Sequence, residues 1–147
     1  MSAAIYWDTS ALLKLYAPEP DSELFRSQLR AQHVPIAISF LHRVELNFAL
    51  TAKELRGEIV AGGAKRLFES FLEHRAQGRF LEIPWGDDVE HHARIALSTC
   101  IGLQPPVMLR SLDGLHLGAV LAAGIQKITT TDIRLQNAAL AVGLAVV

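Results

Sequence analysis

The sequence lacks the features that mark several classes of protein. Cys100 is the one cysteine in 147 residues, which excludes an intramolecular disulfide and is typical of a reducing compartment. The apolar stretches are too short and too interrupted to span a membrane, and no cationic segment followed by an apolar run opens the chain. We therefore expect a cytoplasmic protein with no membrane association.

An excess of charge of one sign is also lacking. Fourteen Lys and Arg residues face fifteen Asp and Glu residues, so the net charge is -1 and no global positive field marks a nucleic-acid binder. Any contact with RNA would need a local basic patch. Half of the residues are hydrophobic, which excludes a disordered chain, and the length fits a single domain over residues 1–147.

Short β-prone runs alternate with helical patterns along the chain. We expect strands at 5–7, 35–38, 80–83 and 127–130, and an edge strand at 145–147. We expect helices at 10–17, 21–32, 39–57, 64–77, 87–99, 111–123 and 133–142, with Ser10 and Ser39 as N-caps. Strands separated by helices predict an α/β fold, a three-layer α/β/α sandwich with a central, mostly parallel sheet of four or five strands.

Two acidic residues stand out because they follow strands. Asp8 ends the first expected strand, and Asp132 follows the fourth. In open α/β sheets, ligands bind beyond the carboxyl ends of the strands. Both carboxylates are therefore expected at the edge of the sheet where ligand sites form.

Two further acids lie early in apolar helices. Glu45 belongs to a helix whose apolar pattern predicts a buried stripe of Leu41, Val44, Phe48, Ala52 and Leu55. Asp113 and His116 are the only ionisable residues of an apolar helix, and their spacing puts them on one face. An unpaired charge near a core is costly, so each acid needs a compensating partner.

The four acids together suggest a metal site. Four carboxylates at one edge would repel each other and raise some of their pKa values, and a divalent cation removes that conflict. An all-oxygen donor set favours Mg²⁺ or Mn²⁺ over Zn²⁺. Any one acid alone is better explained as a helix-dipole partner or half of a salt bridge; only the set of four favours a metal.

Several blocks of sequence resemble the PIN-domain family, and within it the VapC-type toxins of bacterial toxin–antitoxin pairs. They are IYWDTSALLKLY at 5–16, VEL at 44–46, LDGLHL at 112–117, TTDIRL at 130–135 and AVGL at 141–144. Each block is weak alone, but their order and separation in a chain of this length are specific. The resemblance covers nearly the whole chain.

The resemblance implies a metal-dependent endoribonuclease that hydrolyses RNA phosphodiester bonds. Its metal-binding and catalytic acids would be Asp8, Glu45, Asp113 and Asp132, with Mg²⁺ or Mn²⁺ as the cofactor. It also implies a homodimer and a cognate antitoxin that blocks the site. The helices between residues 21 and 77 are candidates for the dimer seam and the antitoxin groove.

Four polar residues are candidates for supporting roles. Thr9 and Ser10 are placed to orient Asp8 or a water, and Thr130 to support Asp132, although turn and cap chemistry explains all three equally well. His116 is a candidate for substrate contact or an ordinary hydrogen-bonded core histidine.

Two basic residues and two other functions remain open. Lys14 and Arg43 would meet phosphates or would simply be solvated helix charges. The alternatives to a ribonuclease are a related nuclease acting on DNA and a non-catalytic module that binds protein or RNA. An incomplete acid set would favour the non-catalytic module, and here all four acids are present. The sequence does not specify the RNA that is cut, the antitoxin or the number of metals.

Overall fold

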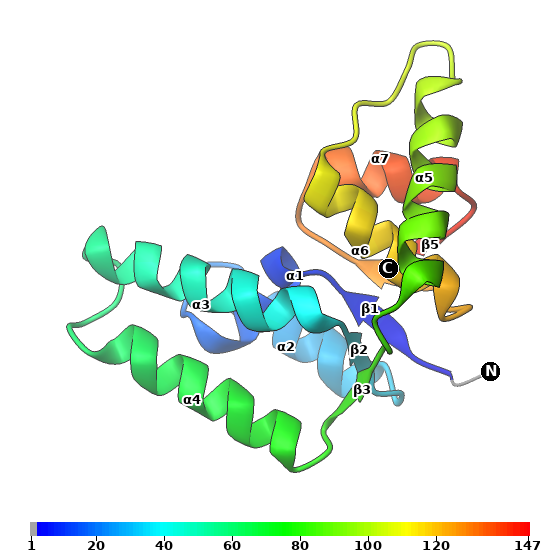
Figure 1. Ribbon diagram of the computed structural model, residues 1–147. Coiled ribbons are helices and arrows are strands. Elements are labelled where there is room, and N and C mark those ends of the chain that lie inside the picture. Colours follow the sequence, from blue (N-terminus) through cyan, green and yellow to red (C-terminus); the bar gives the residue numbers. More distant parts are fainter. Residues whose placement is uncertain (1–2) are drawn as a thin grey trace.

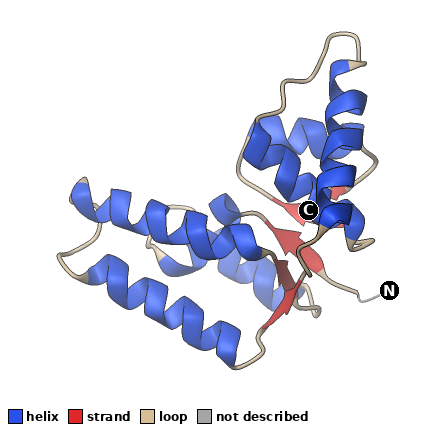
Figure 2. Cartoon of the chain, in the orientation of Figure 1, coloured by secondary structure: helices blue, strands red, loops and turns tan. Residues whose placement is uncertain are grey.

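A five-stranded, all-parallel sheet organises the computed structural model, which describes residues 3–147 (Figures 1 and 2). The strands are β1 (Ile5–Trp7), β2 (Ile36–Ile38), β3 (Phe80–Glu82), β4 (Lys127–Thr129) and β5 (Ala145–Val146), in the order β3-β2-β1-β4-β5. Each neighbouring pair is parallel. The predicted α/β fold with a parallel sheet of four or five strands is confirmed.

Helices cover both faces of the sheet. They are α1 (Thr9–Tyr16), α2 (Ser22–Ala31), α3 (Phe40–Leu55), α4 (Gly63–Ala76), α5 (Asp87–Ile101), α6 (Ser111–Ala122) and α7 (Ile133–Ala141). Helices α1 to α4 lie on one side of the sheet, and α5 to α7 lie on the other (Figure 1). These elements match the sequence-based expectations to within one or two residues at most boundaries.

The central strand β1 separates two hydrophobic cores. Ile5 and Trp7 pack into the core beneath α1 to α4, and Tyr6 between them packs into the core beneath α5 to α7. This follows from the alternation of side chains along a strand. All three residues are buried, so β1 is held on both faces and fixes the position of whatever follows it.

Two caps show how the strand ends pass into helices. Ser39 caps α3 as predicted, accepting from the backbone N–H of Leu41, and the His42 ring accepts from the Ser39 N–H. The prediction that Ser10 caps the first helix is wrong. Asp8 is the N-cap of α1 and accepts from the Ala11 N–H, because the helix begins at Thr9, directly after the strand.

The predicted buried stripe of α3 is also wrong. Val44, Phe48 and Leu55 are exposed, with 74% of the Phe48 surface open. The buried residues of the helix are Leu41, His42, Leu46 and Leu50. The helix carries apolar residues on two faces, and the face with Leu46 and Leu50 packs into the core that it shares with α1 and α4.

Within residues 3–147, the helices are each too short or too polar to cross a membrane.

Candidate active site

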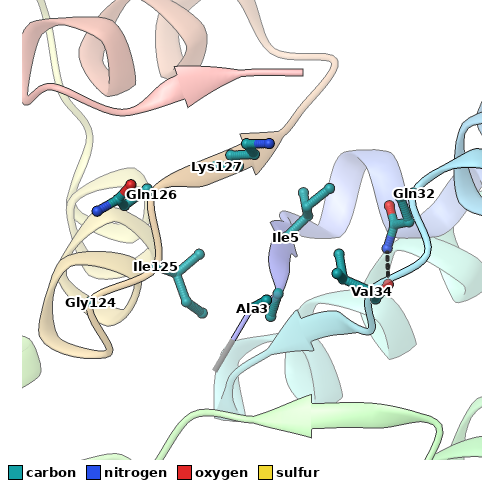
Figure 3. A pocket seen from close by; sticks show the side chains of 9 residues that line it. Ala3, Ile5, Gln32, Val34, Gly124, Ile125, Gln126 and Lys127 are labelled. Atoms are coloured by element: carbon teal, nitrogen blue, oxygen red, sulfur yellow. Dashed lines mark hydrogen bonds between the residues drawn. The ribbon is translucent and has the colours of Figure 1, made fainter. Parts of the chain in front are cut away.

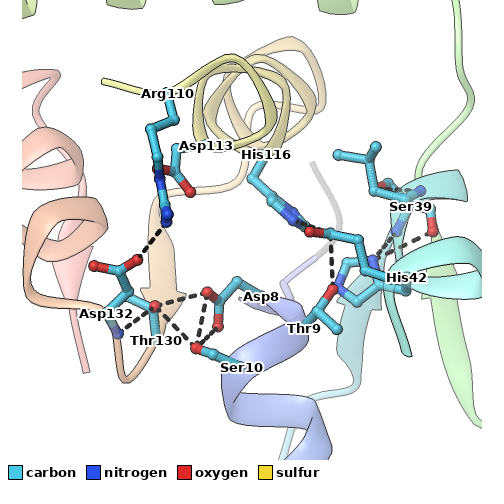
Figure 4. Close-up of polar contacts among 12 residues, drawn as sticks. Asp8, Thr9, Ser10, Ser39, His42, Arg110, Asp113, His116, Thr130 and Asp132 are labelled. Atoms are coloured by element: carbon cyan, nitrogen blue, oxygen red, sulfur yellow. Dashed lines mark hydrogen bonds and ion pairs between the residues drawn. The ribbon is translucent and has the colours of Figure 1, made fainter. Parts of the chain in front are cut away.

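Polar side chains gather at the carboxyl ends of the three central strands (Figure 4). Asp8 and Ser10 follow β1, Ser39 and His42 follow β2, and Thr130 and Asp132 follow β4. Glu45 comes from the second turn of α3, and Asp113 and His116 come from the first turns of α6. The structure therefore brings all four predicted acids to one edge of the sheet.

Asp8 is held by hydroxyl groups on both carboxylate oxygens. Ser10 Oγ lies 2.7 Å from Oδ1 and 2.9 Å from Oδ2, and Thr130 Oγ1 donates to Oδ2 at 2.7 Å. The carboxylate is buried, and burial raises its pKa although Ser10, Thr130 and the Ala11 N–H oppose the shift. Within residues 3–147, the side-chain partners of Asp8 are hydroxyl groups and not cations.

Glu45 has a different set of partners. Thr9 Oγ1 donates to its Oε1 at 3.0 Å, and His116 Nε2 lies 2.5 Å from the same oxygen. Burial alone would raise the pKa of this carboxyl, but His116 and Thr9 outweigh burial and lower it. Glu45 is therefore ionised near neutral pH.

A buried chain of polar groups stands behind Glu45. The Tyr6 hydroxyl lies 2.6 Å from His116 Nδ1 and 3.2 Å from Ser39 Oγ. Burial raises the pKa of Tyr6 well above its usual value, so its hydroxyl keeps its proton. The Glu45 carboxylate only accepts, so His116 Nε2 donates to it.

His42 completes this chain from the side of β2. Its Nε2 lies 2.6 Å from the Trp7 carbonyl, an acceptor only, so Nε2 carries the proton and Nδ1 accepts from the Ser39 N–H at 2.9 Å. Burial and the nearby His116 lower the pKa of His42 to about 3, so the ring is neutral. His42 thus ties β1 to the start of α3, the helix that carries Glu45.

Arg110 joins the two remaining acids. Its Nε donates to Asp113 Oδ2 at 3.0 Å, and its Nη2 donates to Asp132 Oδ2 at 3.0 Å. Asp132 also caps α7 by accepting from the Arg134 N–H, and its own N–H donates to Thr130 Oγ1 at 3.1 Å. Thr130 therefore links Asp132 to Asp8 through one hydroxyl.

The donor set fits a hard divalent cation, because four carboxylates and several hydroxyls converge on one edge. In residues 3–147, however, no three His, Cys, Asp or Glu side chains stand close enough to hold a metal ion as they lie. The reason is visible in their bonds: Arg110 lies between Asp113 and Asp132, and Glu45 is engaged by Thr9 and His116. A metal would have to draw these carboxylates inward.

Of the predicted supporting residues, Thr9 has a different partner than expected and Thr130 has an additional one. Ser10 does contact Asp8, but Thr9 contacts Glu45, and the Thr130 side chain bonds Asp8 as well as the Asp132 backbone. His116 is buried and contacts Glu45, so it is a hydrogen-bonded core histidine that reaches an acid of the site.

The two predicted basic residues lie outside this network. Lys14 is paired with Glu19 and with Asp21, the latter at 2.8 Å, which favours a structural role. The Arg43 guanidinium lies over the ring of Phe40, 5.6 Å from its centre. Neither contacts any of the four acids.

Sequence reasoning missed Tyr6, His42 and Arg110. Arg110 carried a usable signal, since it precedes Asp113 by three residues. Tyr6 carried a weaker one, a hydroxyl in the middle of an apolar strand that must find a partner when buried. His42 was missed because the expected buried stripe of α3 does not include it, whereas the structure buries it.

A separate cavity of about 350 Å³ lies at the opposite ends of the strands (Figure 3). Ile5, Val34 and Ile125 are among its lining residues, and no carboxylate lines it. The chemistry of the molecule is therefore concentrated at the edge that carries the four acids.

The parallel sheet and its acidic carboxyl edge define an α/β protein with a polar site built from strand ends and first helical turns. The family model of the PIN domain matches residues 5–140. The chain belongs to the PIN domain family, as the resemblance in sequence predicted. It is 32% identical, over 147 residues, to Ribonuclease VapC46 of Mycobacterium tuberculosis, with 99% of this chain and 97% of that protein covered.

Two solved structures share the fold. VapBC2 from Rickettsia felis, bound to a DNA fragment from its promoter, superposes with a TM-score of 0.67 at 17% identity, covering 98% of this chain and 97% of that one. VapBC-1 from nontypeable Haemophilus influenzae gives a TM-score of 0.64 at 14% identity, covering 98% and 96%. At these identities the likeness is one of fold.

Proposed function

We propose that this protein is a metal-dependent endoribonuclease and the toxin of a toxin–antitoxin pair. The observation that carries the proposal is the meeting of Asp8, Glu45, Asp113 and Asp132 at the carboxyl edge of one sheet. Membership of the PIN domain family and 32% identity to a protein named as a ribonuclease support RNA as the substrate.

The four acids have unequal roles in this proposal. Asp8 and Asp113 are buried and would be direct ligands of Mg²⁺ or Mn²⁺. Glu45 would bind directly or through a water, and Asp132, which already caps α7, would orient the others. The bound cation would lower the pKa of a water and polarise the phosphate, which is the chemistry of metal-assisted phosphodiester hydrolysis.

The remaining residues of the site keep these acids in place. Ser10 and Thr130 hold the Asp8 carboxylate from two sides, so it does not turn away from the edge. His116 and Thr9 hold Glu45 ionised. Glu45 near neutral pH is thereby available as a base or as a ligand.

A protein partner is part of the same proposal. The structural neighbours are named as VapBC pairs, and the toxin-type resemblance implies an antitoxin that covers the acid edge and a toxin homodimer. Val44, Phe48 and Leu55 form an exposed apolar face on α3, the helix that carries Glu45. An amphipathic helix of an antitoxin bound there would lie beside the site.

The proposal is tested by incubating purified, antitoxin-free protein with total RNA in the presence of Mg²⁺ or Mn²⁺, and then with a chelator. We expect discrete fragments that need both the metal and Asp8. Asp8→Asn keeps the N-cap of α1, because asparagine also caps helices, and should abolish cleavage without unfolding the chain. Retained cleavage by this variant would refute the assignment.

Asp87→Asn is a matched control. Asp87 is also an acid in the first turn of a helix, but it is exposed and its contacts do not involve the site. It should cleave RNA as the unmodified protein does. Cleavage of DNA with RNA left intact would favour the related DNA nuclease, and folded protein that cleaves neither would favour a non-catalytic binding module.

A further inference from the structure

Arg110 forms ion pairs with two of the four acids. It immediately precedes α6, and its guanidinium spans from Asp113 in that helix to Asp132 at the start of α7 (Figure 4). Nε serves one carboxylate and Nη2 the other, each at 3.0 Å. The side chain therefore bridges two segments that come together only in the folded chain.

The charge of this bridge is permanent, because a guanidinium is not deprotonated in proteins. Asp113 is only 8% exposed, and within residues 3–147 its only ion pair is with Arg110. Burying an ionised carboxylate without a cation beside it costs free energy. Arg110 thus does for Asp113 and Asp132 what a bound metal would do.

A metal and the guanidinium compete for the same oxygens. Oδ2 of each carboxylate accepts from Arg110, and the positive charge beside these oxygens would repel a divalent cation that binds them. The acids are not preassembled as a three-ligand site in the described residues, and the bridge is part of the reason.

The Arg110 side chain is also exposed enough to move away from the two carboxylates. Its side chain is 62% exposed, whereas the Asp113 side chain is 11% exposed. An ion pair open to water on one side exchanges partners at low cost, because solvent screens it. The exposed guanidinium is therefore the member of the pair that can leave, and its departure would let a metal draw the carboxylates inward.

We propose that Arg110 is an exchangeable counter-cation of the metal site. It neutralises Asp113 and Asp132 in the metal-free protein and gives way when a divalent cation binds, so it sets the metal affinity of the site. The inference rests on the proposed metal-dependent function, and it adds a residue that tunes when the site is loaded.

Titration calorimetry of Mn²⁺ into metal-free protein, without RNA, tests the exchange. Arg110→Gln removes the competing charge at similar size, so the Kd for Mn²⁺ should fall by about five-fold or more. The rise in Tm on adding Mn²⁺ should be larger for the variant than for the unmodified protein. Circular dichroism of the metal-free variant checks that it folds. An unchanged or weaker Mn²⁺ affinity overturns the proposal.

Arg134→Gln is the matched control. Arg134 lies two residues from Asp132, is exposed, and makes no side-chain ion pair within the described part of the chain, so the variant has the same change in net charge. It should tighten Mn²⁺ binding much less. Equal tightening by both variants would mean that net charge alone acts, which also overturns a specific role for Arg110.

Asp113→Asn separates this inference from the proposed function. If the unmodified protein binds Mn²⁺ and Asp113→Asn abolishes binding, the metal site stands and the Arg110 result is decisive by itself. If neither protein binds Mn²⁺, the metal site fails and the counter-cation role falls with it.

Discussion

The hydroxyl of Tyr6 lies 2.6 Å from Nδ1 of His116, across the face of the central strand. This contact orients a buried imidazole, and the opposite nitrogen of that ring lies 2.5 Å from Glu45. A phenol in the middle of β1 is therefore coupled to an acid of α3 through a side chain of α6. The acid edge depends on groups that lie beneath it as well as on the acids themselves.

Tyr6→Phe should lower RNA cleavage by about ten-fold while the protein remains folded, because partners behind a ligand typically contribute that much. Phenylalanine keeps the packing of the ring and removes the hydroxyl that contacts Nδ1 of His116 and Oγ of Ser39. Leaving that buried nitrogen unpaired should also lower the free energy of unfolding by about 1–3 kcal/mol. Single-turnover cleavage and urea unfolding measure the two effects.

Tyr16→Phe provides the control for this prediction. The Tyr16 hydroxyl lies 2.7 Å from Nδ1 of His74, a pair of the same kind away from the acid edge. This variant should lose stability without losing cleavage at saturating metal. Equal activity of the Tyr6→Phe and unmodified proteins would show that the bond to His116 is not needed for the reaction.

Asp8→Asn should stabilise the metal-free protein at neutral pH. Burial raises the pKa of Asp8 above its ordinary value of 3.8, so the folded state binds that proton more tightly than the unfolded state does. The resulting stability is fully present below the ordinary pKa and is lost as the pH rises through the raised one. Asparagine does not ionise, so the variant does not lose this stability as the pH rises.

The free energy of unfolding of both proteins, measured in chelator at several pH values, checks this sign. The advantage of Asp8→Asn should grow as the pH rises from about 4. The lowered pKa of Glu45 has the opposite effect, because the stability that it contributes is lost as the pH falls. Glu45 is present in both proteins, so its contribution cancels in the difference between their free energies of unfolding. An advantage that shrinks with rising pH would contradict the expected burial effect.

Gly118→Ala should destabilise the protein by about 1–3 kcal/mol, as overpacking does. A Cβ at this position would lie 2.3 Å from the carbonyl oxygen of Val89, so α5 and α6 would have to move apart. Gly114→Ala, in the same helix, is the control. Its Cβ would meet Leu109 at an ordinary 3.7 Å, and alanine should stabilise the helix by up to about 1 kcal/mol. Thermal unfolding of both variants should therefore shift in opposite directions.

Phe48→Glu should change the free energy of unfolding by no more than about 0.5 kcal/mol, because the side chain is 74% exposed. Leu46→Ala, two residues away and fully buried, should cost about 2–5 kcal/mol. Urea unfolding of the two variants tests which face of α3 meets the core. A large loss of stability in Phe48→Glu would mean that the face expected from sequence is the buried one. A small loss would mean that Phe48 is free to contact a partner.

Much of the acid edge was predictable from local sequence. Asp8 and Asp132 directly follow runs of β-prone residues, and a strand that ends at a fixed point delivers the next side chain to the edge of the sheet. The alternation of strands and helices was also predictable, because each element has its own hydrophobic periodicity. The caps at Ser39 and the boundaries of most helices followed from the same local rules.

The buried face of α3 was not predictable in this way. Its apolar residues fall on two faces, one with Leu46 and Leu50 and the other with Val44 and Phe48, and periodicity does not say which one packs into the core. The expectation for Glu45 therefore rested partly on a wrong stripe, although the residue does reach the site. Its contact with His116 comes from α6, which is remote in sequence.

The sequence by itself determined the order of strands and helices, the family, and which carboxylates stand at strand ends, because these depend on short-range patterns. Only the tertiary structure decided how those carboxylates are balanced. Arg110 reaches Asp132, Thr130 reaches Asp8, and Tyr6 reaches His116 across large separations in the chain. Such contacts depend on the packing of two helical layers against one sheet, and no local pattern encodes the distance between two side chains that meet only in the folded chain.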